Sequence, residues 1–263
     1  MSAAPLLELR ALSGGYEPVQ VFRDVTLSMR RDESIGLFGP NGHGKTTLLK
    51  TVSGLIDPWS GDILFDGVRL NRDGVRGRRA SQYFNYDAFT PRRMDPRRVV
   101  AAGLIHVAQG SLLFPELTVR ETLDIARLST HGRGDPRTLM QSALALFPRL
   151  TERLDHKTRF LSGGERQMLS MSCGIIAAPK LMILDEPTLG LSPKLRHELA
   201  EAVRAIRRTG VPLIVVDQDV EFLKSLIDVL YLFDHGRISG HIARAELPSH
   251  DGLMRMLFGE AAK

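Results

Sequence analysis

The feature that most constrains this chain is a glycine-rich loop, Gly-x-x-x-x-Gly-Lys-Thr, at residues 39–46. The apolar run 34–38 precedes the loop, and a helical pattern begins at its last residue. A strand, such a loop and a helix in this order are typical of a phosphate-binding loop, the P-loop. Glycines let the backbone amides reach phosphate oxygens, and the start of the helix adds unpaired N–H groups. A glycine-rich helix cap is the competing interpretation, which the Lys-Thr pair disfavours. We therefore predict a nucleotide site.

Two side chains of the loop have distinct expected roles. Lys45 is predicted to be a catalytic cation that places its charge on the β- and γ-phosphates, and the Thr46 hydroxyl is predicted to bind Mg²⁺. The residues of this loop predicted to contact nucleotide are Gly39, Pro40, Asn41, Gly42, His43, Gly44, Lys45, Thr46 and Thr47.

The composition fits a globular domain in a reducing compartment. The 263 residues are 43% apolar, which is enough for a core, and Cys173 is the single cysteine, so an internal disulfide is impossible. The N-terminus lacks a basic segment followed by an apolar core, and no export signal is expected. No apolar stretch approaches the roughly 20 residues of a membrane-spanning helix, so we expect any link to a membrane to come through a partner.

Positive charge is concentrated in one segment. Of the net charge of +5, residues 69–98 contribute nine arginines against three aspartates, and the rest of the chain is close to neutral. The irregular stretch 71–98 also carries a cluster of aromatics and is predicted to be a long exposed insertion. Basic residues interleaved with aromatics can bind single-stranded nucleic acid. A solvated loop that packs its aromatics on the domain surface is the favoured interpretation, and nucleic acid is not an expected partner.

Strand patterns dominate the beginning of the chain. Segments 6–12 and 21–27 flank a predicted turn at 14–18, which indicates an antiparallel pair, and 61–67 reads as a further strand. Tyr16 is expected at the tip of the turn. An aromatic residue there can stack on an adenine ring or can be an ordinary loop tyrosine, and the residues alone favour neither.

Helical patterns dominate residues 110–178, which we predict to form a helical subdomain. A short strand at 104–108 ends at Gln109, and Thr118 begins a capping box before a helix at about 118–129. A second helix is predicted at about 136–147, after a flexible segment at 131–134.

A second phosphate cradle is predicted within this region. Leu-Ser-Gly-Gly-Glu at 161–165 opens a helix that extends to about Ala177, with Ser162 as its N-cap. The two glycines allow close approach of the backbone to an anion. One compact domain does not obviously need two such cradles.

Two carboxylates follow the buried strand predicted at 181–185. Open α/β sheets bind ligands at the carboxyl ends of their strands, so Asp185 is expected to hold Mg²⁺. Glu186 is expected to orient or deprotonate the attacking water. A simple helix cap is the alternative, which the P-loop upstream disfavours.

Together these motifs resemble the nucleotide-binding subunits of ATP-binding-cassette (ABC) transporters, over roughly residues 6–259. The resemblance implies an α/β fold: a P-loop NTPase core with a mixed sheet, an antiparallel β subdomain and a helical signature subdomain. It implies one ABC ATPase domain over 1–263. Its expected parts are a core (1–109 and 179–245), the helical subdomain (110–178), the basic insertion (71–98) and a C-terminal helix (246–263).

The resemblance also implies ATP and Mg²⁺ as cofactors and a head-to-tail dimer. Each ATP would lie between the P-loop of one subunit and the signature of the other. The signature residues expected to contact that ATP are Ser162, Gly163, Gly164 and Glu165. Tyr16 resembles the adenine-stacking aromatic, and Gln109 resembles the glutamine linked to Mg²⁺ and water whose loop reports to the membrane partner.

One position departs from the common family pattern. Where most relatives carry a histidine against the γ-phosphate, this chain has Asp217-Gln218-Asp219. Gln218 can donate a hydrogen bond but cannot carry a proton, so slower hydrolysis or an altered pH dependence is expected. A Glu-Gln-Asn sequence at this site resembles the second ATPase subunit of branched-chain amino-acid importers, as do 187–193 and 253–259. In that branch the position of Gln109 is often glutamate, and the insertion is shorter.

The prediction is an ATP-binding and ATP-hydrolysing motor subunit of an ABC importer for branched-chain amino acids or related small solutes such as amides or urea. Expected partners are membrane permease subunits, a second identical or homologous ATPase subunit and, indirectly, a solute-binding protein. The expected location is cytoplasmic, peripheral on the inner face of the cell membrane. Two alternatives remain open. One is a soluble ABC ATPase that acts on nucleic acid or ribosomes, and the other is a binding-only regulatory cassette, suggested by Gln218.

Overall fold

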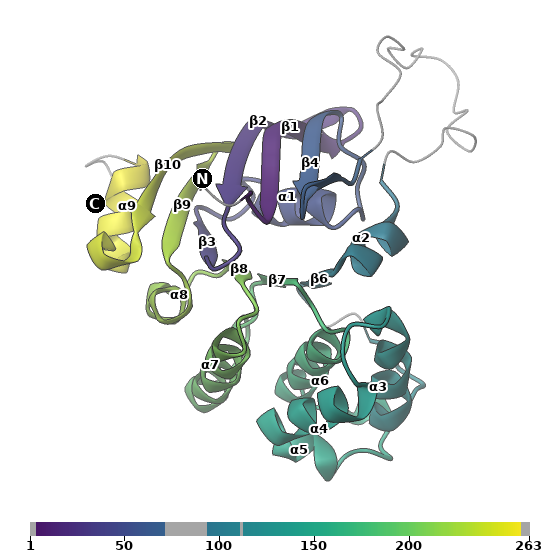
Figure 1. The fold of residues 1–263 in the computed structure, drawn as a ribbon. Helices are drawn as coiled ribbons and strands as arrows, with labels where there is room; N and C mark the ends of the chain where they lie inside the picture. The colour runs from purple at the N-terminus through teal and green to yellow at the C-terminus, as the bar shows by residue number, and fades with distance from the viewer. Residues whose placement is uncertain (1–3, 72–93, 111–112, 259–263) are drawn as a thin grey trace.

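The computed structural model describes residues 4–71, 94–110 and 113–258, which form two β-sheets with helices around them (Figure 1). A six-stranded sheet has the order β10-β9-β3-β8-β7-β6, and a four-stranded sheet has the order β2-β1-β4-β5. The predicted fold class is confirmed: a P-loop core with a mixed sheet, an antiparallel β subdomain and a group of helices.

The six-stranded sheet is parallel except at one edge. Its strands are β3 (Ile35–Phe38), β6 (Leu104–Val107), β7 (Leu181–Asp185), β8 (Leu213–Val216), β9 (Val229–Asp234) and β10 (Arg237–Ala243). Strand β10 runs antiparallel to β9, and the other pairs are parallel. Strands β3, β7 and β8 are buried along their whole length, which explains their apolar sequences. The carboxyl ends of these strands meet at the same edge of the sheet.

The four-stranded sheet is antiparallel, and its first hairpin differs from the prediction. Its strands are β1 (Leu7–Tyr16), β2 (Val19–Met29), β4 (Ser60–Phe65) and β5 (Val68–Arg69). The predicted turn at 14–18 is too long, because residues 14–16 continue β1 and pair with β2. A Cβ on Gly15 would lie 2.1 Å from the Val19 carbonyl oxygen, so glycine permits this close approach of the strands. Tyr16 therefore ends a strand.

Helix α1 (Lys45–Val52) lies between the two sheets (Figure 1). Its side chains Leu48 and Leu49 are buried in a hydrophobic cluster that includes Leu9 of β1 and Ile214 of β8. Because α1 packs on both sheets, its N-terminus and the P-loop before it are held at the junction of the two layers.

A group of helices lies on the opposite side of the six-stranded sheet from α1 (Figure 1). Its members are α3 (Val119–Arg127), α4 (Pro136–Leu146), α5 (Pro148–Thr151) and α6 (Gly163–Ile176). Helices α3 and α4 both pack on α6. The two predicted helices are confirmed, and Thr118 forms the predicted capping box with Glu121.

The segment 131–134, predicted to be flexible, is linked to neighbouring helix ends by Arg133. The guanidinium donates hydrogen bonds to five backbone carbonyl oxygens. The acceptors are Val100 (3.0 Å), Ala101 (2.7 Å), Ser129 (3.2 Å), Ala177 (3.0 Å) and Ala178 (2.8 Å). Four of them lie at the C-terminal ends of α2 (Pro96–Ala102) and α6, where unpaired carbonyls carry the negative end of the helix dipole. One long side chain thus joins these helix ends, and the flexibility of the segment stays a prediction.

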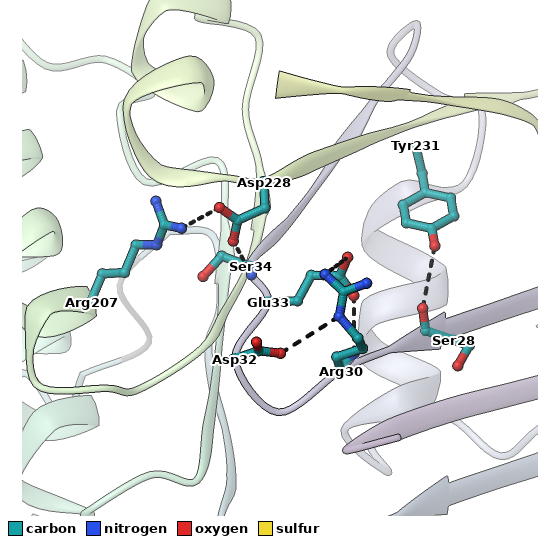
Figure 2. A network of polar contacts seen from close by, with 8 residues as sticks. All are labelled: Ser28, Arg30, Asp32, Glu33, Ser34, Arg207, Asp228 and Tyr231. Atoms are coloured by element: carbon teal, nitrogen blue, oxygen red, sulfur yellow. Dashed lines mark hydrogen bonds and ion pairs between the residues drawn. The ribbon is translucent and has the colours of Figure 1, made fainter. Parts of the chain in front are cut away.

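A polar network fixes the chain where it enters β3 (Figure 2). The Asp228 carboxylate accepts hydrogen bonds from the Ser34 backbone N–H (2.8 Å) and from the Arg207 guanidinium (2.5 Å). The Asp228 N–H donates to the Ser34 carbonyl (2.7 Å), and the Ser34 hydroxyl accepts from the Leu213 N–H (3.1 Å). The network thus joins β3 to β8 and β9 and to helix α7 (Pro193–Arg208), immediately before the P-loop.

The basic insertion 71–98 falls mostly outside the described residues, which omit 72–93. At one end, the buried Asn71 side chain donates to the Gly61 carbonyl and accepts from the Ile63 N–H, both at 2.9 Å. At the other end, residues 94–98 are predicted to be irregular, but Met94 is buried and Asp95 caps helix α2. The prediction is wrong at 94–98 because an aspartate N-cap followed by proline starts a helix there.

Two further helices lie near the C-terminal strands. Helix α8 (Val220–Leu226) joins β8 to β9, and α9 (His250–Phe258) occupies part of the range predicted for a C-terminal helix. Within the described residues, every helix is too short or too polar to span a bilayer.

Candidate functional site

The P-loop backbone is packed between two strands from different sheets. A Cβ on Gly39 would lie 1.9 Å from the Phe233 carbonyl oxygen of β9. Gly44 has a φ of +101°, and a Cβ there would lie 2.7 Å from Val21 Cγ1 of β2. Larger residues fit neither position, so these two glycines fix the path of the loop. The loop amides follow a buried strand and lead directly into α1, as the sequence predicts.

Lys45 is buried at the start of α1, within the loop itself. Its ammonium donates hydrogen bonds to the carbonyl oxygens of Gly39 (2.7 Å) and Pro40 (2.8 Å). Burial lowers the pKa of Lys45, while the negative charges of Glu186 and Asp185 partly oppose this shift. The structure therefore places the predicted cation near both predicted carboxylates.

Thr46 and Asp185 meet across the loop. The Thr46 hydroxyl donates to Asp185 Oδ1 at 3.1 Å. The other carboxylate oxygen, Oδ2, is buried and has no hydrogen-bond partner among the described residues. Burial raises the pKa of Asp185 to about 6; the hydrogen bond from Thr46 opposes this rise and the charge of Glu186 adds to it. A hydroxyl beside an unpartnered buried carboxylate oxygen fits Mg²⁺, a hard cation that takes oxygen ligands.

Glu186 and Gln109 also come together, from the ends of neighbouring strands β7 and β6. Gln109 Nε2 donates to Glu186 Oε2 at 2.8 Å. The backbone of Glu186 has a φ of +47°, and its N–H donates to the Val216 carbonyl at 2.8 Å. A non-glycine residue in this left-handed conformation is uncommon and turns the side chain away from the direction of the strand. The carboxylate of Glu186 and the side-chain amide of Gln109 thus lie at the carboxyl edge of the six-stranded sheet.

Gln218 reaches the P-loop, and a neighbouring buried acid holds its segment. Gln218 Nε2 donates to Asn41 Oδ1 at 3.1 Å. The carboxylate of Asp217 accepts from the Thr188 hydroxyl (2.8 Å) and backbone N–H (3.2 Å), and burial raises its pKa. Sequence reasoning missed the Asp217–Thr188 pair. Its signal is an acid directly after an apolar strand, next to the strand that carries the catalytic pair.

The signature residues lie away from this site. Ser162 caps α6, and its hydroxyl accepts from the Glu165 N–H at 3.2 Å. The Glu165 carboxylate in turn accepts from the Ser162 N–H (2.8 Å) and contacts Arg153 (3.3 Å). The side chain of Glu165 therefore stabilises the helix start, while Ser162 and Gly163 are exposed. Helix α6 and the P-loop lie on opposite sides of the six-stranded sheet (Figure 1).

Three predicted contact residues have different surroundings. Tyr16 is 51% exposed at the end of β1, in the hairpin whose Val21 packs against Gly44. Thr47 is buried. The His43 imidazole contacts Asp234 at the end of β9 and His235 in the turn that follows, so its backbone is the part that remains as a predicted phosphate contact.

Known proteins are similar to this chain over most of its length. Residues 22–189 match the family model described as ABC transporter. The chain is 33% identical over 242 residues to the "High-affinity branched-chain amino acid transport ATP-binding protein BraG" of Pseudomonas aeruginosa, covering 92% of this chain and 94% of that protein. It is 28% identical over 255 residues to the "Probable branched-chain amino acid transport ATP-binding protein LivF" of Archaeoglobus fulgidus, covering 97% and 99%. A solved structure described as the ATP binding subunit of an ABC transporter gives a TM-score of 0.77 at 27% identity, over 96% of this chain and 99% of that chain.

Proposed function

Because the chain belongs to the ABC transporter family, we propose that it is the ATP-binding and ATP-hydrolysing motor subunit of an importer. One observation carries the proposal: Lys45, Thr46, Asp185 and Glu186 converge at the carboxyl edge of one sheet. This edge is where α/β proteins bind nucleotides.

Each residue at this edge has a part in binding or hydrolysis. Lys45 and the loop amides hold the phosphates, and Thr46 and Asp185 hold Mg²⁺. The ion, when bound, supplies positive charge to the phosphate oxygens. Glu186 positions or deprotonates the attacking water, and the hydrogen bond from Gln109 orients its carboxylate. Gln218, which is joined to the loop through Asn41, donates a hydrogen bond to the γ-phosphate.

A second subunit completes the site. Ser162, Gly163 and Gly164 clasp the ATP that is held by the P-loop of the opposing subunit, and Glu165 holds their helix start in shape. The exposed Ser162–Gly163 end of α6 supports this role, because it presents helix N–H groups to an outside ligand. Tyr16 stacks on the adenine of its own subunit.

The names of two relatives support the proposed transported class. BraG and LivF are named for branched-chain amino acid transport, and they match 92% and 97% of this chain. We infer a permease for these or related small solutes as the membrane partner, with this subunit peripheral on the inner face of the membrane. A solute-binding protein acts with the complex but does not contact this chain.

Glu186→Gln tests the catalytic assignment. The glutamine keeps an oxygen that can accept the Gln109 N–H but cannot take a proton, so turnover should fall by at least about a hundredfold while ATP affinity stays the same. Steady-state ATP hydrolysis by the subunit with its permease and nucleotide binding by the isolated subunit measure the two quantities.

Glu221→Gln is the matched control, because Glu221 is exposed on α8 and should tolerate the change. Hydrolysis by Glu186→Gln at the rate of this control would remove Glu186 from the proposed role.

A further inference from the structure

A group of metal-binding side chains lies beside the P-loop and takes no part in the proposed ATP chemistry. His43 Nδ1 lies 3.0 Å from Asp234 Oδ1, and His235 Nδ1 lies 2.8 Å from the same oxygen. One ligand atom from each of the three residues lies within 4.8 Å of the other two. The structure assigns to His43, Asp234 and His235 a binding site for one divalent transition-metal ion of the Zn²⁺ class.

The donor set selects the class of metal. Two imidazole nitrogens and one carboxylate oxygen suit Zn²⁺, Co²⁺ or Ni²⁺, whereas Mg²⁺ and Ca²⁺ prefer oxygen ligands alone. Ligand atoms about 2.0–2.1 Å from a tetrahedral ion lie roughly 3.3 Å apart. The contacts of 2.8 and 3.0 Å to Asp234 therefore need to open by only a few tenths of an ångström.

The two polar contacts of His43 Nδ1 cannot both be favourable hydrogen bonds. Its Nδ1 faces the Asp234 carboxylate at 3.0 Å and also the backbone N–H of His235 at 3.2 Å. Protonated, Nδ1 donates to the carboxylate but opposes the N–H; unprotonated, it accepts from the N–H but opposes the carboxylate. A cation bound by the lone pairs of Nδ1 and Oδ1 removes the repulsion between nitrogen and oxygen.

The fold holds the three side chains in place without metal. The two imidazole rings lie 4.5 Å apart at a tilt of 46°, so ring packing sets them side by side. The His235 side chain is 78% exposed, which leaves a path for the ion and for water to complete its coordination.

Metal binding at this site would affect the P-loop, because one of the three ligands belongs to it. His43 belongs to the P-loop, Asp234 is the last residue of β9, and His235 begins the turn between β9 and β10. A bound ion therefore ties the loop to the β9–β10 hairpin. The proposal stands on these contacts and does not depend on the transport function.

Metal titration of the untagged full chain tests the site. Co²⁺ is the probe, because its visible absorption reports nitrogen ligands and low coordination number, and Zn²⁺ is then followed by calorimetry. We expect one stoichiometric site. Either His235→Ala or His43→Ala should weaken metal binding by about tenfold or more, since each removes a ligand.

His197→Ala is the matched control, because His197 is exposed on α7 and should leave the metal affinity unchanged. Circular dichroism of each variant confirms that it is folded. A wild-type chain that fails to bind Co²⁺ at millimolar concentration, or a stoichiometric site that survives both His235→Ala and His43→Ala, would overturn the proposal.

Discussion

The proposed metal ligand Asp185 carries a cost to folding. The side chain is 1% exposed, and burial raises the pKa of its carboxyl to about 6. Above that pH the folded chain must hold a buried charge that the unfolded chain holds in water. The ionised carboxylate therefore reduces stability at neutral pH, and protonation removes the reduction as the pH falls from about 6 toward 3.8.

Asp185→Asn should accordingly stabilise the metal-free chain at neutral pH, by up to about 3 kcal/mol. The gain should shrink as the pH falls below about 6, because the wild-type carboxyl then becomes neutral. Urea unfolding at a series of pH values measures the difference. The same variant should lose Mg²⁺-dependent hydrolysis.

Asp155→Asn, at a side chain that is 83% exposed, provides the comparison and should change stability little. A loss of stability in Asp185→Asn at neutral pH would contradict the assigned cost of burial.

Individual site residues were predictable where a local motif carries them. The P-loop and the Asp185-Glu186 pair are each a short contiguous motif at the carboxyl end of a strand, so the sequence of each segment was enough to predict it. The contact of Asp217 with Thr188 was not predictable, because it depends on the parallel pairing of β7 with β8. The acid after the apolar strand marks Asp217 as a candidate, but the sequence of its own segment does not identify Thr188 as its partner.

At the scale of elements, Arg133 joins the helical group to the core. It donates to carbonyls at the ends of α2 and α6 and near α3, so a single guanidinium satisfies groups from three segments. Burial lowers the pKa of Arg133 but leaves it charged, as arginine remains in proteins.

Arg133→Met should destabilise the chain by about 2–3 kcal/mol, because it keeps an apolar stem but leaves several carbonyls without a charged donor. Thermal or urea unfolding of the purified chain measures the change. Arg137→Met, on an exposed position of α4, is the control and should shift stability by less than about 0.5 kcal/mol. Equal stability of the two variants would show that the Arg133 contacts contribute no net stability.

The network before β3 offers a comparison of two acids in one region (Figure 2). Asp228 binds the Ser34 N–H and Arg207, whereas Asp32 is 85% exposed and contacts only Arg30 at 3.6 Å among the described residues. Asp228→Ala should cost about 2–3 kcal/mol, since it leaves a backbone N–H and a guanidinium without an acceptor.

Asp32→Ala should cost no more than about 1 kcal/mol, as exposed ion pairs do. Denaturant unfolding of both variants under the same conditions measures the loss in the free energy of unfolding for each, and the two losses are then compared. A larger loss for Asp32→Ala would refute the role given to Asp228.

Elements were predictable from periodicity, and their ends were less so. Strands β3, β6 and β7 follow from apolar runs, whereas β9 and β10 were not predicted. The boundaries failed where close packing or one side chain decides the structure. Gly15 extends β1 past the expected turn, and Asp95 starts α2 inside the expected insertion.

At the scale of the whole molecule, the P-loop and the signature helix α6 lie on opposite sides of the six-stranded sheet (Figure 1). Under the proposed function, a single copy therefore cannot close both on one ATP. Gly163 permits a direct test. A Cβ on Gly163 would meet only Arg166 Nη2, at 4.0 Å, whereas one on Gly164 would lie 2.5 Å from Leu195 Cδ1. A larger residue at 163 therefore fits within one chain.

Gly163→Val, in the Glu186→Gln background, should leave ATP affinity of the isolated chain unchanged and abolish its ATP-dependent dimer. Light scattering after gel filtration with ATP measures the mass. Gln141→Val, on the exposed face of α4, is the control and should still dimerise. An undiminished dimer in Gly163→Val would place the signature outside the interface.

The tight seating of the P-loop against β2 and β9 has a thermodynamic consequence. Its conformation is already fixed by Val21 and the Phe233 carbonyl, so a nucleotide meets a cradle that does not have to be ordered on arrival. Little of the binding free energy is then consumed in ordering the loop, and more of it is retained as affinity for the nucleotide.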